Sequence, residues 1–402
     1  MCLPVMRAIR ERLPDSEIRV MALTTAFNAA RAAGEKPLGF RDFTMLPGGK
    51  RALAYGERLL ALTGIGHTSV TREESLAYLG FNFLEWVERD GEEAAWALWE
   101  QEGRNAFLPV SFFRAVLRHL LVDVVITTNS PRSEQAAIEA AVELGIPCLT
   151  MVDLFSLQGD PFLRRAVQAD CLTVLCEATR ENLIAAGIDA KKIFVTGNPA
   201  FDSLVTDEAA SLGAAWRAQR GWRGQNIVLW AGHLEAAQSL PAELAGSGLG
   251  DELQRQLVEW IEARPSACLV VRYHPNEWRA FTPPPLHPRI HWSQPECEPL
   301  LPLLMAADQV VVQVTTVGVQ AHFAGKRIIN IGYSPYVRST GIDYSLFGMS
   351  ERADNPAMLT TLLDRGLAGG TPVSRANFAK HGRAAQAIAS HVYALARKRN
   401  TR

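Results

Sequence analysis

Residues 181–204 read ENLIAAGIDAKKIFVTGNPAFDSL, and this stretch decides the fold more than any other. Its first part has the composition of a helix that ends at Gly187, the residue type that most often follows a helix C-terminus. Residues 193–196 are mostly apolar and rich in β-branched side chains, which predicts a short strand. The Gly-Asn-Pro run at 197–199 then breaks the chain. The stretch therefore predicts a helix, a strand and a hinge in succession.

Short apolar runs alternate with longer helical patterns on both sides of this hinge. Before it, strands are expected over residues 18–23, 122–127, 147–152, 171–175 and 193–196, and after it over 227–230, 268–272, 309–314 and 327–331. Helices are expected over residues 1–13 and through most of 73–121. This alternation predicts an α/β protein with two parallel, doubly wound, Rossmann-type sheets.

The strand sets predict where the domains lie. We expect an N-terminal Rossmann-like domain over residues 1–204, a C-terminal Rossmann-like domain over 205–372, and a C-terminal helix over 373–402. A doubly wound domain usually begins with a strand, whereas this chain begins with a helical pattern. The first strand of the N-terminal domain is thus expected either upstream of Met1 or to be missing from the sheet.

Composition excludes several classes of protein. The 402 residues are 48% hydrophobic and 21% charged, which is typical of globular domains and excludes disorder and coiled coils. The 41 Lys and Arg against 42 Asp and Glu leave a net charge of -1, so no global field favours nucleic acid. No apolar run reaches the ~18 residues of a membrane helix, and the six cysteines show no metal-ligand spacing. We expect a cytoplasmic protein with buried free thiols.

A family resemblance starts at the hinge segment. Residues 181–204 resemble the segment of UDP-GlcNAc 2-epimerases, and of related GT-B glycosyltransferases, that leads from the N-terminal domain into the linker. In the same register, residues 3–9 look like the first helix of that family, 232–235 like its His-Arg stretch, and 308–326 like its diphosphate clasp. The resemblance covers nearly the whole chain and implies a GT-B-like fold whose two domains face an interdomain cleft. It also places the family's first strand and its Gly-containing phosphate loop before Met1.

The clearest candidate ligand site follows the strand expected at 309–314. Thr315, Thr316 and Gly318 open a helix there, so free backbone N–H groups and two hydroxyls could bind a pyrophosphate. Gly318 would allow the phosphate to approach closely. The alternative is that the two threonines only cap the helix.

Three further residues of the C-terminal domain are nucleotide or catalytic candidates. His274, in a His-Pro pair after a strand, resembles the His-Pro motif of transferases that use CMP-sugars. His233 follows the strand at 227–230, where ligands bind in open α/β folds, and is a candidate catalytic or phosphate-binding group. By the resemblance, Glu298 lies in the loop that passes the nucleotide base. Each of the two histidines could instead be a structural or solvent-facing residue.

The N-terminal domain offers the sugar or acceptor site. Asn129, Ser130 and Arg132 form a polar turn between a strand and a helix, which could bind a sugar or merely cap that helix. Asp153 ends the next strand and is the first candidate for the catalytic base. The alternatives for that base are Glu134, Asp160 and His233.

Departures from the epimerase pattern set the expected reaction. Asn129 stands where the epimerases carry an acid, Asp153 where they carry Glu, and Ala321 and His322 replace an acidic pair on the nucleotide-binding helix. We therefore expect a metal-independent glycosyltransferase without a resident cofactor, which moves a sugar from a UDP or CMP donor to a carbohydrate or glycoconjugate acceptor, as in polysaccharide biosynthesis. The alternatives are a UDP-GlcNAc 2-epimerase or nucleotide-sugar hydrolase, and a non-catalytic nucleotide-sugar binding protein. A dimer is possible.

Overall fold

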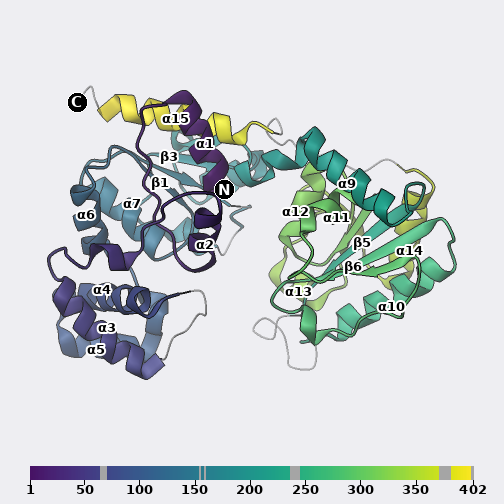
Figure 1. The fold of residues 1–402 in the computed structure, drawn as a ribbon, viewed down its shortest axis with the longest axis horizontal. Helices are drawn as coiled ribbons and strands as arrows, with labels where there is room; N and C mark the ends of the chain where they lie inside the picture. The colour runs from purple at the N-terminus through teal and green to yellow at the C-terminus, as the bar shows by residue number, and fades with distance from the viewer. Residues whose placement is uncertain (64–69, 154, 158–159, 236–244, 371–381, 400–402) are drawn as a thin grey trace. The chain divides into compact units, whose positions relative to one another are not determined.

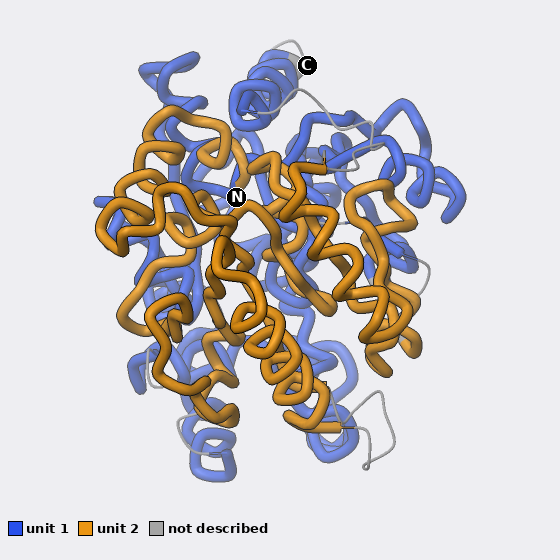
Figure 2. The backbone as a smooth tube through the Cα atoms, turned by 90° about the vertical axis from the view of Figure 1, so that its right-hand side faces the viewer, with its two compact units in different colours: residues 1–200, 378–402 blue, residues 201–377 orange. Residues whose placement is uncertain are grey.

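Two parallel sheets form the framework of the chain in a computed structural model, which describes residues 1–63, 70–153, 155–157, 160–235, 245–370 and 382–399. The chain divides into two compact units (Figure 2). Unit 1 comprises Met1–Ala200 and Phe378–Arg402, and unit 2 comprises Phe201–Asn377. The predicted boundary at residue 372 and the predicted helix start at 373 lie outside the described residues.

The elements of unit 1 begin and end with a helix. In chain order they are α1 (Cys2–Arg12), α2 (Thr24–Ala32), α3 (Gly49–Thr63), α4 (Arg72–Asp90), α5 (Glu92–Glu102), α6 (Val110–His119), β1 (Val125–Thr128), α7 (Ser133–Glu143), β2 (Cys148–Met151), β3 (Cys171–Val174), α8 (Glu177–Ala185), β4 (Ile193–Val195) and α15 (Ala384–Arg399). The helices expected over residues 1–13 and through 73–121 are confirmed.

The sheet of unit 1 has the order β1-β2-β3-β4 and is parallel throughout. β2 and β3 are buried along their whole length because helices cover both faces of the sheet. Leu149 and Met151 pack with α1 and α15, two helices from opposite ends of the chain that lie side by side (Figure 1). Cys148 points to the other face, where it packs with α6 and α7.

The elements of unit 2 alternate between strands and helices. They are α9 (Asp207–Gln219), β5 (Asn226–Gly232), α10 (Gly248–Glu262), β6 (Ala267–Tyr273), β7 (Ile290–Trp292), α11 (Leu300–Ala306), β8 (Gln309–Val312), α12 (Thr316–Phe323), β9 (Arg327–Ile331), α13 (Pro335–Thr340), β10 (Glu351–Ala353) and α14 (Pro356–Leu367). Figure 1 shows α9, α11 and α12 on one side of the sheet and α10 and α14 on the other.

The strand order of unit 2 fixes where a ligand can bind. The six parallel strands run β7-β6-β5-β8-β9-β10, which in chain order is 3-2-1-4-5-6, the order of the dinucleotide-binding Rossmann fold. The order reverses between β5 and β8, and the helices that follow these two strands, α10 and α12, lie on opposite sides of the sheet (Figure 1). Ligands of such sheets bind in the crevice outside the carboxyl ends of the strands at this switch point.

One predicted strand is wrong. Residues 18–23 form no strand, because their backbone pairs only around Leu38, with a single bridge between Met21 and Leu38. An apolar, β-branched run becomes a strand only when a partner extends along it. Two strands that the sequence analysis did not expect, β7 and β10, are three-residue strands at the two edges of the sheet in unit 2.

The structure also shows which cysteines are buried and whether any helix could cross a membrane. Cys148, Cys171, Cys176 and Cys268 are buried free thiols, as predicted, whereas Cys2 and Cys297 are exposed. Among the helices of the described segments, none combines the length and the apolar character needed to cross a membrane.

Candidate functional site

The switch point of unit 2 gathers polar residues from neighbouring strand ends. β5 and β6 are in register up to Gly232 and Tyr273, so His233 and His274 leave adjacent strands at the same edge of the sheet. The backbone N–H of His274 donates to the carbonyl of Gly232 over 3.0 Å. On the other side of β5, β8 ends at Val312 and leads into α12. The sequence prediction that His233, His274 and the threonines follow strand ends is confirmed.

His233 is held by the backbone on both sides of its ring. Its Nδ1 lies 2.7 Å from the carbonyl oxygen of Leu234, and its Nε2 lies 3.2 Å from the backbone nitrogen of Val314. A carbonyl can only accept and an N–H can only donate, so the ring is the neutral tautomer with its proton on Nδ1. His233 thereby connects the ends of β5 and β8.

The buried carboxylate of Glu235, near His233, is not among the site residues predicted from the sequence. Glu235 is 2% exposed and accepts hydrogen bonds from Gln313 Nε2 at 2.6 Å, Ser334 Oγ at 2.6 Å and the Tyr336 backbone N–H at 2.7 Å. The side-chain oxygen of Gln313 in turn accepts the His233 backbone N–H at 3.1 Å. This network, which we call the Glu235 network, links the segments that follow β5, β8 and β9.

His274 is the more accessible of the two histidines. Its side chain is 46% exposed, and its Nδ1 lies 3.9 Å from Glu277 Oε1. The other oxygen of Glu277 accepts the backbone N–H of Leu234 at 2.8 Å, which ties this loop to the end of β5. An accessible imidazole at a strand end can donate a hydrogen bond or a proton to a ligand.

The threonines at the start of α12 have different environments. Thr315 is the N-cap, and its hydroxyl accepts a long 3.4 Å hydrogen bond from the Val317 N–H, whereas Thr316 is exposed. A Cβ atom on Gly318 would lie 2.5 Å from Tyr344 Cε2, so this glycine makes room for the tyrosine ring. The expected contacts of all three residues with a nucleotide stay predictions.

Glu298 lies within a polar cluster after β7. Its carboxylate accepts from Trp216 Nε1 at 2.9 Å and lies 2.8 Å from His291 Nε2. Burial works to raise the pKa of Glu298, but the hydrogen bonds from His291, Trp216 and Ser293 outweigh this effect and lower the pKa below its ordinary value. Intramolecular partners thus occupy this carboxylate, and its contact with a nucleotide base remains a prediction.

In unit 1, Asn129 connects the ends of β1 and β2. Its side-chain oxygen accepts the Asp153 backbone N–H at 3.1 Å, and its carbonyl accepts from Arg165 Nη2 at 2.8 Å. Asn198, from the hinge motif, donates from Nδ2 to the Asp153 carboxylate at 3.1 Å. Asp153 is half-buried at this edge, as a base that follows a strand end should be.

Glu134 lies on the same turn as Asn129, in the first turn of α7. Its carboxylate accepts hydrogen bonds from the Thr128 hydroxyl and the Ser130 backbone N–H. Burial raises the pKa of Glu134, although these two hydrogen bonds oppose the effect. Arg132 has φ 67° and ψ -108°, a conformation that costs a non-glycine residue energy and occurs most often at functional sites. The structure therefore brings two carboxylates, Glu134 and Asp153, to the edge where Asn129 lies.

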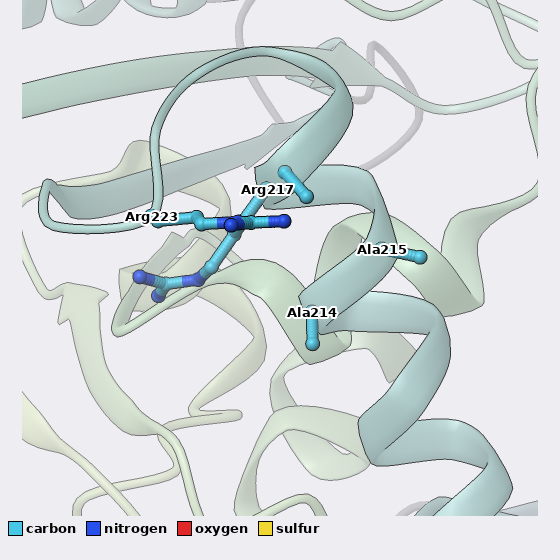
Figure 3. Close-up of a pocket in the computed structure, with 5 residues that line it drawn as sticks. Ala214, Ala215, Arg217 and Arg223 are labelled. Atoms are coloured by element: carbon cyan, nitrogen blue, oxygen red, sulfur yellow. The ribbon is translucent and has the colours of Figure 1, made fainter.

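Unit 2 also has a surface hollow, which lies on α9 (Figure 3). Ala214, Ala215, Ala218, Arg217 and Arg223 line it. Arg217 pairs with Asp308 at 2.7 Å, directly before β8 begins, so the hollow lies toward the amino ends of the strands. Ligands of parallel sheets bind at the opposite, carboxyl edge. Over the described segments, no group of three or more His, Cys, Asp and Glu side chains could hold a metal ion.

Comparisons with known proteins identify the fold. No protein-family model matches the sequence, and the comparison with curated proteins finds no match. Among solved structures, the S. aureus MnaA–UDP co-structure is 12% identical, with 97% of this chain and 91% of that chain covered and a TM-score of 0.55. The UDP-GlcNAc 2-epimerase from Methanocaldococcus jannaschii is 18% identical, with 71% and 80% covered and a TM-score of 0.51. The chain has the GT-B-like fold of the UDP-GlcNAc 2-epimerases, which confirms the predicted fold class.

Proposed function

We propose that this chain is an enzyme that acts on a nucleotide sugar and binds the diphosphate at the switch point of unit 2. The observation that carries the proposal is the convergence of His233, His274 and the start of α12 on the carboxyl ends of β5, β6 and β8. Backbone N–H groups at a helix start and a neighbouring imidazole suit a pyrophosphate. The UDP named in the MnaA co-structure supports a uridine nucleotide as the ligand.

For the reaction, we propose 2-epimerisation of a UDP-GlcNAc-like sugar in preference to the glycosyl transfer expected from the sequence. 2-Epimerisation needs one group that removes the C2 proton and one that protonates the oxygen leaving C1. Burial raises the pKa of Glu134 and so favours its protonated form, which suits it to the donor's role, and Asp153 is placed to accept. Of these two acids, only Asp153 stands at a position where the epimerases carry an acid. The named epimerase among the fold neighbours supports the same reaction.

Glycosyl transfer is the second candidate. Asn129 stands where the epimerases carry an acid, and a transferase needs only one base in unit 1. In either reaction the nucleotide sugar is the substrate, and we propose no resident metal or cofactor.

The test is incubation of the full chain with UDP-GlcNAc in D₂O, followed by NMR of the sugar. Epimerisation removes the C2 proton, so the 2-epimer should appear and deuterium should enter at C2. Asp153→Asn should lower this exchange by about 10²–10⁴-fold, the usual contribution of general acid or base catalysis, while UDP affinity is unchanged. Asp15→Asn, at an exposed position on the chain, is the matched control.

Other outcomes separate the candidates. Release of UDP together with a glycosylated acceptor, formed only when a carbohydrate acceptor is added and without deuterium at C2, would favour the transferase. A wild-type protein that binds neither UDP nor CMP would overturn the proposed function altogether.

A further inference from the structure

The Glu235 network reaches from α13 to the loop that opens α12. Ser334 and Tyr336, at the start of α13, donate to Glu235, which accepts in addition from Gln313. Gln313 accepts from the backbone of His233, whose ring accepts from Val314. Hydrogen bonds to a carboxylate are roughly twice as strong as neutral ones, so Glu235 is the strongest acceptor in this chain of contacts.

Glu235 fixes which way the Gln313 amide points. Its carboxylate can only accept, so the amino group of Gln313 must face it, and the Gln313 oxygen is left to accept the His233 N–H. Gln313 is fully buried and therefore has no water to bond with in another orientation. Asn330 holds the other end of this residue, because its Nδ2 donates to the Gln313 carbonyl at 2.9 Å.

We propose that Glu235 is a positioning residue for the nucleotide site: it sets Gln313 and His233 so that the loop at Val314 and Thr315 is ready to receive a diphosphate. This inference rests on the proposed function, since it assumes that the loop binds phosphate. Glu235 itself is buried, so it acts on the loop through Gln313 and His233. A prearranged loop loses less conformational freedom on binding, which improves affinity without a direct contact.

Glu235→Gln is the informative substitution, because it keeps the shape and removes one acceptor. In the wild type, one oxygen of Glu235 faces Gln313 and Ser334 and the other faces the Tyr336 N–H. A glutamine there has a single oxygen, so its amino group must face a donor on one side or the other. Either the α13 contact or the orientation of Gln313 is lost.

The experiment measures UDP affinity by calorimetry in four full-length proteins. They are the wild type, Glu235→Gln, the exchanged pair Glu235→Gln with Gln313→Glu, and Glu262→Gln, an exposed residue of α10 that controls for the lost charge. We expect Glu235→Gln to weaken UDP binding by about tenfold or more, which is the cost of one charge-assisted hydrogen bond. The exchanged pair restores a donor facing a carboxylate, so its affinity should return to within about threefold of the wild type.

A second measurement does not depend on nucleotide. The ¹⁵N spectrum of the histidines should show the Nδ1-protonated tautomer for His233 in the wild type and in the exchanged pair. In Glu235→Gln that signature should be lost, or signals of both His233 tautomers should appear. This readout keeps the test decisive if the wild type fails to bind UDP, a result that would remove the proposed function but not the positioning of His233.

The inference would be overturned by a Glu235→Gln protein with wild-type UDP affinity and an unchanged His233 tautomer. It would also fail if Glu235→Gln does not fold and the exchanged pair does not restore folding and the His233 signature, since Glu235 would then serve the fold and not this loop.

Discussion

Glu134 is a carboxyl group whose protonation should affect stability. Burial raises its pKa above the ordinary 4.5, so the folded chain holds this proton more tightly than the unfolded chain does. Between the ordinary and the raised pKa, the folded state therefore binds more protons, and stability must fall as pH rises. In Glu134→Gln the side chain stays neutral at every pH, as the protonated carboxyl is. We expect the thermal midpoint of the variant, relative to the wild type, to increase from pH 4 to pH 7.

The control for this comparison is Glu93→Gln, an exposed position of α5. Its midpoint relative to the wild type should stay constant over the same pH range. If the Glu134→Gln difference is equally flat, or slopes in the opposite direction, the proposed buried acid is wrong.

Substitutions of Thr315 and Thr316 should distinguish a role in helix capping from a role in ligand binding. Thr315 is the N-cap of α12, and replacement of a capping threonine costs about 0.5–2 kcal/mol. Since its hydrogen bond is long, Thr315→Val should lower the thermal midpoint by an amount at the low end of that range. Thr316 is exposed, so Thr316→Val should leave the midpoint unchanged and weaken UDP binding by up to about tenfold. Unchanged UDP affinity in Thr316→Val would remove this residue from the site.

At the scale of residues, the sequence predicted positions better than roles. His233, His274 and Asp153 follow strand ends as expected, because strand ends can be recognised from a local apolar run. Partners far apart in the chain leave no local signal. Glu235 accepts a hydrogen bond from the backbone of Tyr336, which lies 101 residues later. No local sequence pattern predicts that contact. Asn198 similarly looked like part of a hinge, whereas its side chain also holds Asp153.

Among the elements, α12 depends on a glycine for its packing. Gly318→Ala would place a methyl group 2.5 Å from the ring of Tyr344 and 3.2 Å from Val312 Cγ2. Overpacking of this kind typically costs about 1–3 kcal/mol, which exceeds the helix propensity gained by alanine. We expect a lower thermal midpoint and, because α12 opens at the candidate site, weaker UDP binding.

Gly248→Ala is the matched control for this substitution. Gly248 lies in the first turn of α10, and a Cβ there would meet nothing within 4 Å. Alanine should leave stability unchanged or raise it by about 0.4–1 kcal/mol. A Gly318→Ala protein as stable as the Gly248→Ala protein would show that Tyr344 can move aside.

Strand prediction succeeded for both sheets except at the two edges of the unit 2 sheet. β5, β6, β8 and β9 are buried along nearly their whole length, and burial on both faces makes a strand mostly apolar and easy to recognise. β7 and β10 are three-residue edge strands that contain the polar residues His291, Glu351 and Arg352, so they lack the apolar run that marked β4. Residues 18–23 have the composition of a strand but no extended partner. Pairing is a property of the whole sheet, so a single segment cannot reveal it.

For the molecule as a whole, each unit has hydrophobic clusters of its own. The cluster around β5, β6 and β8 draws only on unit 2, and the clusters on the two faces of the β1–β4 sheet draw only on unit 1. α15 completes unit 1 from the far end of the chain, because it packs on α1 and beneath Leu149 and Met151. Separate cores are the physical basis on which domains unfold as units.

This division allows nucleotide binding to be assigned to one unit by calorimetry of the full chain. A ligand that binds only the folded form stabilises it by about 2.7 kcal/mol at a concentration of 100 Kd. If UDP binds at the switch point of unit 2, differential scanning calorimetry of the full chain should show one transition raised by about 5 °C, while the transition of unit 1 stays in place. Gly318→Ala identifies the unit 2 transition, since it should lower that same peak. A UDP shift confined to the other peak would place the nucleotide in unit 1 and refute the site at β5 and β8.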